Sequence, residues 1–419
     1  MTFIVGGSKV YSVLGTEWGD TIYGDTSGTV ASGRLGRHKI YGYEGNDKLY
    51  GDAKILEGSA IGGLDLFYAG SGNDYVYGDA YKIRGDAKGY ADTLYGLDGH
   101  DYLYGDAKYM YNNTHGGNDR IFGGDGVDDI YGDAAAMLNY SAGGRDYLYG
   151  QNGNDRIYGD AYRMTGYTKG GNDSIIGAAG NDSLLGDANQ MQYGSKGGND
   201  RILAGTGNDY VCGDSTSMAG LTVGGNDILF GDDGNDRLSG DGWILESGAK
   251  GGNDIVKGDA GNDIVFGDAG NTMAIGATGG NDYVYGGAGN DEVYGDVTVS
   301  PYFPYQNAGP NANDTVDGGT GNDSLGGGTG SDVFVFHKGD GTDVIYDFSG
   351  VNWSDSDHDR IDLTDWHFAS FSALEPYIHY NTTAPGEVTI TLPEGETIYL
   401  ANLLQKGGTH QLTASDFIL

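Results

Sequence analysis

Cysteine and proline are scarce in this sequence, which holds one cysteine, Cys212, and six prolines in 419 residues. A single cysteine excludes an intramolecular disulfide framework, so we expect bound metal ions to stabilise the fold in place of disulfides. Long apolar runs are lacking as well, and none is long enough to span a membrane as a helix. Residues 1–7 have neither the basic nor the apolar region of a Sec-type signal peptide. Export is therefore expected to use a signal elsewhere in the chain.

Positive charge is also scarce, because 23 basic side chains face 60 acidic ones and the net charge is −37. Charge of this size opposes compaction and argues against nucleic acid as a partner. Glycine is abundant, with 81 residues, but its lack of a three-residue period excludes collagen, and 33 tyrosines exclude a flexible linker. A disordered acidic polymer and a protein that folds when cations neutralise it both fit this composition.

Aspartates recur along the chain with a fixed spacing, which favours the second alternative. They form pairs nine residues apart, and successive pairs begin 27 residues apart up to Asp254, after which the interval lengthens to 28 and then 32. The first members of the pairs, here called the first row, are Asp65, Asp92, Asp119, Asp146, Asp173, Asp200, Asp227, Asp254, Asp282 and Asp314. The second members, the second row, are Asp20, Asp47, Asp74, Asp101, Asp128, Asp155, Asp182, Asp209, Asp236, Asp263, Asp291 and Asp323. Asp332 follows the second row at a spacing of nine, and His38 stands where a first-row aspartate is expected.

The residues around each aspartate indicate a turn that binds a cation. The pattern is Gly-x-Gly-x-Asp-x-U-x, where U is a large apolar residue, as in residues 205–211, Gly-Thr-Gly-Asn-Asp-Tyr-Val. Glycine permits positive φ and exposes carbonyl oxygens, and aspartate adds an anionic oxygen. Ca²⁺ takes about 6–8 such oxygen ligands, whereas the repeated positions lack the histidine and cysteine that zinc and copper prefer. Ordinary Asn-Gly or Asp-Gly hairpin turns are the alternative, but hairpins do not require strict recurrence every nine residues.

This pattern resembles the RTX nonapeptide GGxGxDxUx of hemolysin-type calcium-binding proteins, and the resemblance covers roughly residues 15–336. It implies an all-β fold, a parallel β-roll or β-helix solenoid. In such a roll the glycine-rich half of each repeat forms a calcium-bound turn, and x-U-x forms a short strand. We therefore predict an RTX β-roll over residues 38–336 with 27-residue coils, in which the aspartates of both rows and Asp332 ligate calcium.

The two rows also predict the number of ions. One calcium ion between aspartates of consecutive coils gives nine gaps in the first row and eleven in the second, hence roughly 20 Ca²⁺. Their charge of about +40 nearly offsets the net charge of −37. Extracellular calcium modules bind at about 10⁻⁴–10⁻³ M, so folding is expected to be coupled to calcium binding outside the cell.

Each 27-residue coil contains a third nonad that lacks the calcium turn. It opens with Gly-Asp-Ala, and where the calcium aspartate would stand it has Ile83, Met110, Met137, Met164, Met191, Met218 and Leu245. The favoured interpretation is a core plug, in which these adaptable apolar side chains fill the end of the roll. The alternative is a metal site, because thioether ligands suit Cu(I). The segment is either a third, metal-free side of the coil or a loop along one edge. Position eight of this nonad is not apolar, which favours a loop: Gly85, Asn112, Asn139, Gly166.

Aromatic residues recur at the same period. One row is Tyr23, Tyr50, Tyr77, Tyr104, Tyr131 and Tyr158, and a second is Tyr41, Tyr68, Tyr95, Phe122 and Tyr149. Stacked tyrosines stabilise neighbouring strands, and such rows also suit a sugar or a neighbouring molecule; the structural role is favoured.

The composition changes after Phe336, and the chain ends in Asp-Phe-Ile-Leu, residues 416–419. Residues 337–419 resemble the C-terminal cap of secreted RTX proteins such as the serralysin proteases, whose tails end in an acidic residue and three apolar ones. The resemblance implies a β cap and a type I secretion signal, hence the type I secretion machinery as a partner. Residues 1–37 match the repeat poorly and are expected to form an N-terminal cap and a first partial coil. Caps are needed because the ends of a solenoid otherwise expose unpaired strand edges.

Signatures of catalysis are lacking, since the sequence has no HExxH, no G-x-S-x-G and no phosphate loop with Gly-Lys-Ser/Thr. We expect a secreted calcium-binding protein that is not an enzyme. We expect it to serve as a structural or interaction protein outside the cell or at the cell surface. The leading hypothesis is that it self-assembles at the cell surface or in the extracellular matrix. The alternatives are a calcium-dependent module for acidic polysaccharide, similar to the repeat modules of alginate epimerases, and a membrane-active RTX protein. No apolar or amphipathic stretch supports the membrane-active alternative.

Overall fold

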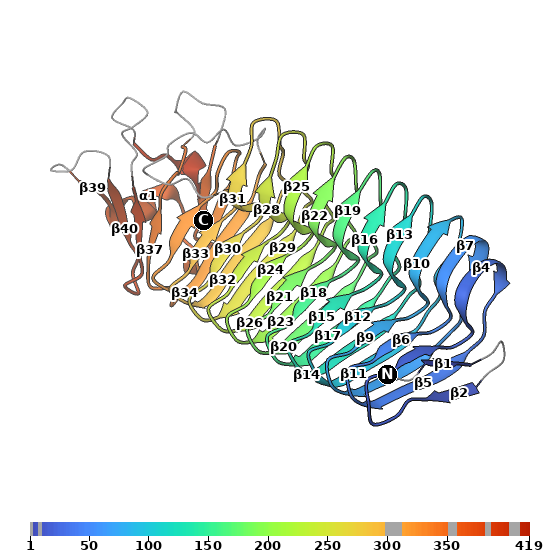
Figure 1. Ribbon diagram of the computed structural model, residues 1–419. Helices are drawn as coiled ribbons and strands as arrows, with labels where there is room; N and C mark the ends of the chain where they lie inside the picture. Colours follow the sequence, from blue (N-terminus) through green and yellow to red (C-terminus); the bar gives the residue numbers. More distant parts are fainter. Residues whose placement is uncertain (1–2, 7–10, 298–311, 351–357, 382–386, 402–410) are drawn as a thin grey trace. The chain divides into compact units, whose positions relative to one another are not determined.

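The computed structural model describes the chain except for residues 1–2, 7–10, 298–311, 351–357, 382–386 and 402–410 (Figure 1). The chain divides into two compact units, Met1–Gly225 and Asn226–Leu419. Both are built from parallel strands stacked coil on coil, which confirms the predicted all-β parallel solenoid. The predicted boundaries after residues 37 and 336 stay predictions.

In the first unit each complete coil contributes one strand to each of three parallel sheets (blue to green in Figure 1). Sheet A contains short strands: β1 (Phe3–Val5), β3 (Thr21–Tyr23), β6 (Lys48–Tyr50), β9 (Tyr75–Tyr77), β12 (Tyr102–Tyr104), β15 (Asp129–Tyr131), β18 (Arg156–Tyr158), β21 (Ser183–Leu185) and β24 (Tyr210–Cys212). Sheet B contains β2 (Tyr11–Leu14), β5 (His38–Glu44), β8 (Leu66–Ser71), β11 (Thr93–Gly99), β14 (Arg120–Gly126), β17 (Tyr147–Asn152), β20 (Ser174–Ala179) and β23 (Arg201–Thr206). Sheet C contains β4 (Thr26–Arg34), β7 (Ala53–Ile61), β10 (Ala80–Gly85), β13 (Ala107–Tyr111), β16 (Ala134–Leu138), β19 (Ala161–Thr165), β22 (Ala188–Gln192) and β25 (Ser215–Ala219).

Neighbouring strands pair in register at the predicted 27-residue period. Leu103 pairs with Ile130 in sheet A, and Met110 pairs with Met137 in sheet C. These apolar side chains have no exposed surface, because alternate residues of a strand point to the interior of the coil. The residue written U in the repeat therefore forms the core, as the pattern predicts.

The third nonad forms sheet C, so the loop interpretation was wrong. Its methionines are fully buried and pack with the alanines of Gly-Asp-Ala in one apolar cluster, which supports the core plug. The polar position eight marks the turn that ends the strand. Asn112 and Asn113 both have positive φ, 61° and 67°, as a tight reversal of the chain requires. The returning segment then pairs with its neighbours through single bridges, as Lys88 does with His115.

The tyrosine row of sheet A lies in the interior and has a structural role. The rings from Tyr23 to Tyr158 stack face to face, with centroids 4.5 Å apart at the start of the row and 5.0 Å apart at its end. These side chains are at most 8 % exposed. Cys212 continues this cluster as a buried side chain. The second aromatic row, in sheet B, is only half-buried, and Tyr41 and Tyr68 stack at 5.1 Å.

The second unit repeats the three sheets and adds a different C-terminal part (yellow to red in Figure 1). Its sheet A strands are β27 (Arg237–Ser239), β30 (Ile264–Phe266), β33 (Glu292–Tyr294), β35 (Ser324–Gly326) and β37 (Thr342–Ile345). Its sheet B strands are β26 (Ile228–Asp233), β29 (Ile255–Ala260), β32 (Tyr283–Gly289), β34 (Thr315–Gly321), β36 (Val333–Val335), β38 (Arg360–Asp362) and β42 (Phe417–Ile418), and its sheet C strands are β28 (Gly242–Leu245) and β31 (Ala269–Met273).

The C-terminal part closes the second unit with antiparallel strands. The strands β39 (Ile378–Tyr380), β40 (Val388–Thr391) and β41 (Thr397–Leu400) form a meander that joins sheet A by pairing β41 with β37. Short helices η1 (Thr364–Trp366), α1 (Phe371–Leu374), η2 (Glu375–Tyr377) and η3 (Ala414–Asp416) lie between the strands. In the described residues no helix is long and apolar enough to cross a membrane.

Candidate calcium-binding site

Second-row aspartates occupy the turns that lead from sheet B to sheet A. One carboxylate oxygen of each accepts the backbone N–H of the aspartate one coil earlier: Asp47 donates to Asp74 Oδ1 at 2.7 Å, and Asp74 donates to Asp101 Oδ1 at 2.8 Å. The other oxygen, Oδ2, is buried and has no hydrogen-bond donor in Asp74 and Asp101. A Cβ on Gly96 would collide with Asp101 Oδ2 and with the carbonyl oxygen of Gly123. Two oxygen atoms therefore converge on a place that only glycine leaves open.

First-row aspartates occupy the turns that lead from sheet C to sheet B and repeat this arrangement. The N–H of Asp65 donates to Asp92 Oδ1 at 2.6 Å, and Asp92 Oδ2 is buried without a donor. A Cβ on Gly78 would collide with Asp92 Oδ2 and with the carbonyl oxygen of Gly105. Carboxylate and carbonyl oxygens again face the same point.

A third row of aspartates, which the sequence analysis missed, lies beside the first row. Each follows the glycine after a sheet A strand, in most cases within Gly-Asp-Ala: Asp25, Asp52, Asp79, Asp106, Asp133, Asp160, Asp187 and Asp214 in the first unit, and Asp241, Asp268 and Asp296 in the second. One carboxylate oxygen accepts a backbone N–H from the segment that returns from sheet C: Asp160, before β19, accepts from Gly171, after it, at 2.8 Å. The other oxygen of Asp160, Oδ2, is buried without a donor. The recurrence of Gly-Asp after each sheet A strand, every 27 residues from Asp25 to Asp268, is the signal that could have identified this row.

The structure places every sequence-predicted aspartate in one of two buried rows, and none is more than 4 % exposed. Asp332 joins the first row, because its Oδ1 accepts the N–H of Asp314 at 2.8 Å. Two residues outside the prediction extend the rows: Asp359 accepts from Asp332 at 3.0 Å, and Asp343 accepts from Asp323 at 2.9 Å. They were missed because they lie beyond the regular array, after its spacing has changed.

Burial raises the pKa of these carboxyls, because an ionised group is poorly solvated in the interior. Desolvation raises the pKa of Asp74 to about 7 and of Asp101 to about 8, and the charge of the neighbouring row member adds to the effect. In the third row, desolvation and then the negative charge of Asp146 hold the pKa of Asp133 well above its usual range. Buried carboxylates packed this closely require a cation to remain ionised.

The donor set fits calcium. All atoms that converge at the turns are carboxylate or carbonyl oxygens, the hard ligands that Ca²⁺ prefers, and the rigid turns supply them from consecutive coils. Residues of the first, second and third rows would hold the ions, and bound Ca²⁺ would supply the positive charge that the buried carboxylates lack. The fold and the site together define a calcium-binding parallel β-solenoid.

The comparison with protein families agrees with this assignment. The RTX calcium-binding nonapeptide repeat (4 copies) matches residues 23–53, 62–80, 86–107, 113–136, 140–161, 165–190, 196–215, 222–242, 249–273, 277–297 and 311–345. These segments cover more than half of the chain, and the protein belongs to the RTX calcium-binding nonapeptide repeat family. A search of curated proteins found no match.

We expect the metal-free fold to lose stability as the pH rises. The folded-state pKa values of Asp74 and Asp101, about 7 and 8, lie above the ordinary value of an unfolded aspartate, about 3.9, so the fold is favoured while they stay protonated. In chelator, circular dichroism is expected to report strand content near pH 5 that is lost by about pH 8. With calcium present the direction reverses, because protons compete for the same oxygens. Equal chelator spectra at both pH values would contradict this prediction.

The third row is expected to contribute as much to stability in calcium as the two rows predicted from the sequence. Asp133→Asn should lower the free energy of unfolding in calcium by about 1–3 kcal/mol, because it removes a buried charge from the cage. Asp98→Asn, which removes the same charge from an exposed position of β11, is the matched control. Urea unfolding of both variants in calcium measures the difference, and equal stability would show that the third row holds no ion.

Proposed function

We propose that this protein is secreted, folds when it meets extracellular calcium, and then serves as a non-catalytic structural or interaction scaffold. The observation that carries the proposal is the burial of carboxylate oxygens without donors in each row, such as Oδ2 of Asp74, Asp92 and Asp160, because such oxygens need a cation to stay ionised in the interior. The roughly 20 ions that the first two rows predict nearly balance the net charge of −37, and the third row supplies further oxygen ligands to the first-row cages. At cytosolic calcium the cages stay empty, so the chain remains unfolded and suited to export.

Export through a type I secretion system follows from this proposal. The C-terminal strand β42 pairs with β38, so the terminal residues are part of the folded structure once calcium is present. A reporter fused to residues 337–419 is expected to reach the medium of cells that carry a type I exporter. Removal of residues 416–419 from the fusion is expected to keep it inside. Equal export of both fusions would contradict a C-terminal signal.

The turns at the ends of the sheet C strands offer a surface for self-assembly. They expose Tyr140, Tyr167 and Tyr193 to 64 %, 57 % and 71 %, and the first two rings stack at 5.5 Å. Exposed aromatic rows are typical of contact surfaces, unlike the buried row of sheet A. Analytical ultracentrifugation with calcium is expected to show assembly that a triple Tyr→Ser variant at these positions lacks. A wild-type monomer at all concentrations would count against assembly.

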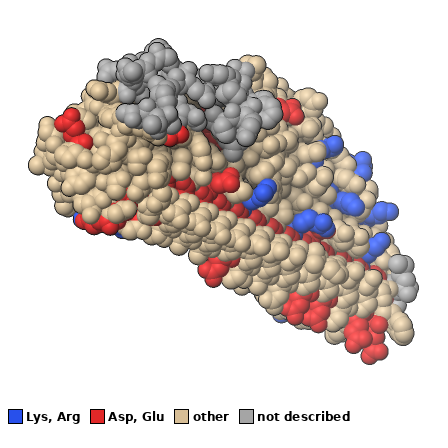
Figure 2. All heavy atoms as spheres, turned by 90° about the vertical axis from the view of Figure 1, so that its left-hand side faces the viewer, with Lys and Arg blue, Asp and Glu red and all other residues tan. Residues whose placement is uncertain are grey.

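Binding of an acidic polysaccharide is the second candidate function, and a row of positively charged lysine side chains favours it. The returning segments place the exposed side chains of Lys88, Lys169 and Lys196 at equivalent positions of their coils, with His115 and Ala142 at that position in the two coils between Lys88 and Lys169. Figure 2 shows basic side chains gathered beside a row of acidic ones. A glycan array in calcium tests this candidate: binding that Lys169→Glu/Lys196→Glu reduces would support it, and a blank array would remove it.

A further inference from the structure

Position 38 breaks the rule of the first row, because a histidine occupies it. His38 is 2 % exposed, and its backbone N–H donates to Asp65 Oδ1 at 2.6 Å, the same bond that first-row aspartates make. A Cβ on Gly24 would collide with His38 Nδ1 and with the carbonyl oxygen of Gly51. One coil later, Asp65 Oδ2 has the equivalent place beside Gly51. The imidazole of His38 therefore stands where a calcium-binding carboxylate stands in every other first-row cage of the first unit.

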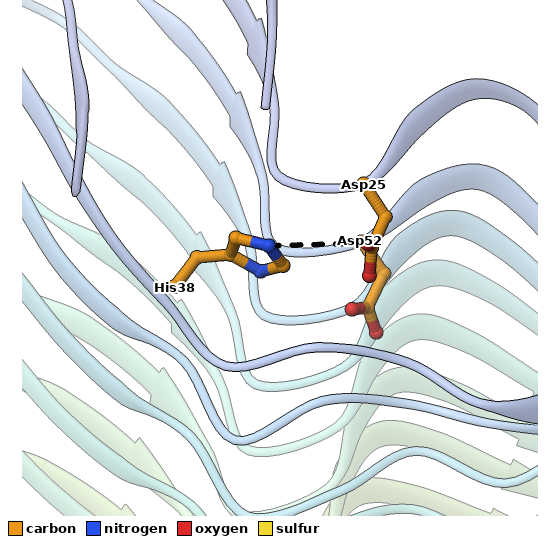
Figure 3. Close-up of side chains that lie close together, drawn as sticks. All are labelled: Asp25, His38 and Asp52. Atoms are coloured by element: carbon orange, nitrogen blue, oxygen red, sulfur yellow. Dashed lines mark ion pairs between the residues drawn. The ribbon is translucent and has the colours of Figure 1, made fainter. Parts of the chain in front are cut away.

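Two third-row carboxylates complete this terminal cage. Asp25 Oδ2 accepts the N–H of Gly36 at 2.9 Å, and Asp52 Oδ2 accepts the N–H of Gly63 at 2.8 Å. These bonds leave Asp25 Oδ1 and Asp52 Oδ1 buried without a donor. One ligand atom from each of Asp25, His38 and Asp52 lies within 4.8 Å of the other two, and Figure 3 shows the imidazole beside both carboxylates.

The position of Asp65 orients the imidazole for metal binding. His38 Nδ1 lies 3.3 Å from Asp65 Oδ1, and His38 Nε2 lies 3.9 Å from Asp25 Oδ1. When Nδ1–H donates to Asp65, the lone pair of Nε2 faces the two free carboxylate oxygens. A carboxylate that fixes the tautomer of a histidine ligand in this way is the usual support of a transition-metal site.

We propose that Asp25, His38 and Asp52 form a transition-metal site, selective for Zn²⁺ over Ca²⁺, at the N-terminal end of the first-row cages. Calcium takes oxygen ligands only, whereas one imidazole and two carboxylates form a mixed set that zinc accepts. The aspartate-to-histidine change thus converts one cage from calcium to zinc while the surrounding turns stay the same. The competing explanation is a protonated His38 that replaces the cation by pairing with Asp25 and Asp65.

The test uses the full chain folded in calcium, loaded with Zn²⁺ and desalted into calcium buffer before its metals are measured by mass spectrometry. Co²⁺, whose visible absorption reports nitrogen and oxygen ligation, serves as a second probe. Wild-type protein is expected to retain one Zn²⁺ per chain. His38→Asp, which restores the calcium cage, is expected to lose this ion and to gain one Ca²⁺. His115→Gln, which changes an exposed histidine of the same unit, is the matched control and should retain the zinc.

A second variant covers the case in which His38→Asp folds poorly. Asp25→Asn is expected to lower the Zn²⁺ affinity by about 10- to 100-fold while the calcium-induced circular dichroism stays unchanged. Wild-type protein that retains no zinc, or equal zinc content in wild type and His38→Asp, would overturn the site and leave the protonated histidine as the explanation. Failure of all variants to fold with calcium would instead contradict the proposed function, so the two failures are distinguishable.

Discussion

Removal of calcium is expected to unfold this protein. Chelation at neutral pH should abolish the strand signal in circular dichroism and expand the chain to a radius of gyration of about 75 Å, the value of an unfolded chain of this length. The physical reason is the density of buried carboxylates, since each coil of the regular array brings three aspartates into the interior. Without cations, ionisation of these groups opposes the fold through desolvation and mutual repulsion.

The return of calcium is expected to refold the chain cooperatively, with a midpoint at about 10⁻⁴–10⁻³ M. Cooperativity follows because the carboxylate of each cage also joins two coils: Asp92 faces the cage with Oδ2 and accepts the N–H of Asp65, one coil earlier, with Oδ1, so an ion that orders Asp92 orders both coils. Magnesium at the same concentration is the control, because its strict octahedral geometry suits these cages poorly. Small-angle scattering measures the change in size. A chain that stays compact in chelator at neutral pH would show that the carboxylates do not depend on calcium.

Much of the fold was predictable because the repeat is strict. The 27-residue period predicts which residues pair across coils, and the apolar residue two positions after each aspartate predicts what lies in the core, as at Leu103 after Asp101. Sheet C was not predictable in the same way, because Asn112 favours a loop in the sequence, whereas in the structure it marks the turn after a strand. A polar residue at the end of a short strand does not distinguish the two, because the strand needs only Ala107 and Met110 to face inward.

The candidate site was predictable where sequence and ligand pattern coincide. First-row and second-row aspartates stand in glycine-rich turns, and this local signature is sufficient to find them. The third row lacks the signature, because the excursion through sheet C separates Asp106 from Gly117, its partner across the turn, by 11 residues. Only the path of the chain shows that the two halves of this turn meet. For the same reason the sequence marked His38 as a missing carboxylate but did not indicate that Asp25 and Asp52 surround it.

A valine at Gly132 is expected to disrupt the first-row cages more than any single loss of charge. A Cβ at this position would collide with the carbonyl oxygen of Gly159 and with Asp146 Oδ2. The first is backbone of the next coil and cannot move without opening the ladder, and the second is needed for the ion. Gly132→Val should therefore lower the free energy of unfolding in calcium by about 3–5 kcal/mol, the range of severe core substitutions.

Gly28→Val is the matched control, because Gly28 is exposed in β4 and a Cβ there meets only the Thr26 hydroxyl, at 3.6 Å. It is expected to change the stability by about 0.5 kcal/mol or less. Hydrogen exchange in calcium locates the damage: in Gly132→Val, protection should fall in β13, β16 and β19 and persist in distant coils, because each coil contacts only its neighbours. If both variants unfold at the same temperature and bind the same amount of calcium, the turns tolerate a side chain. The oxygens beside Gly132 then do not form the cage inferred from their convergence.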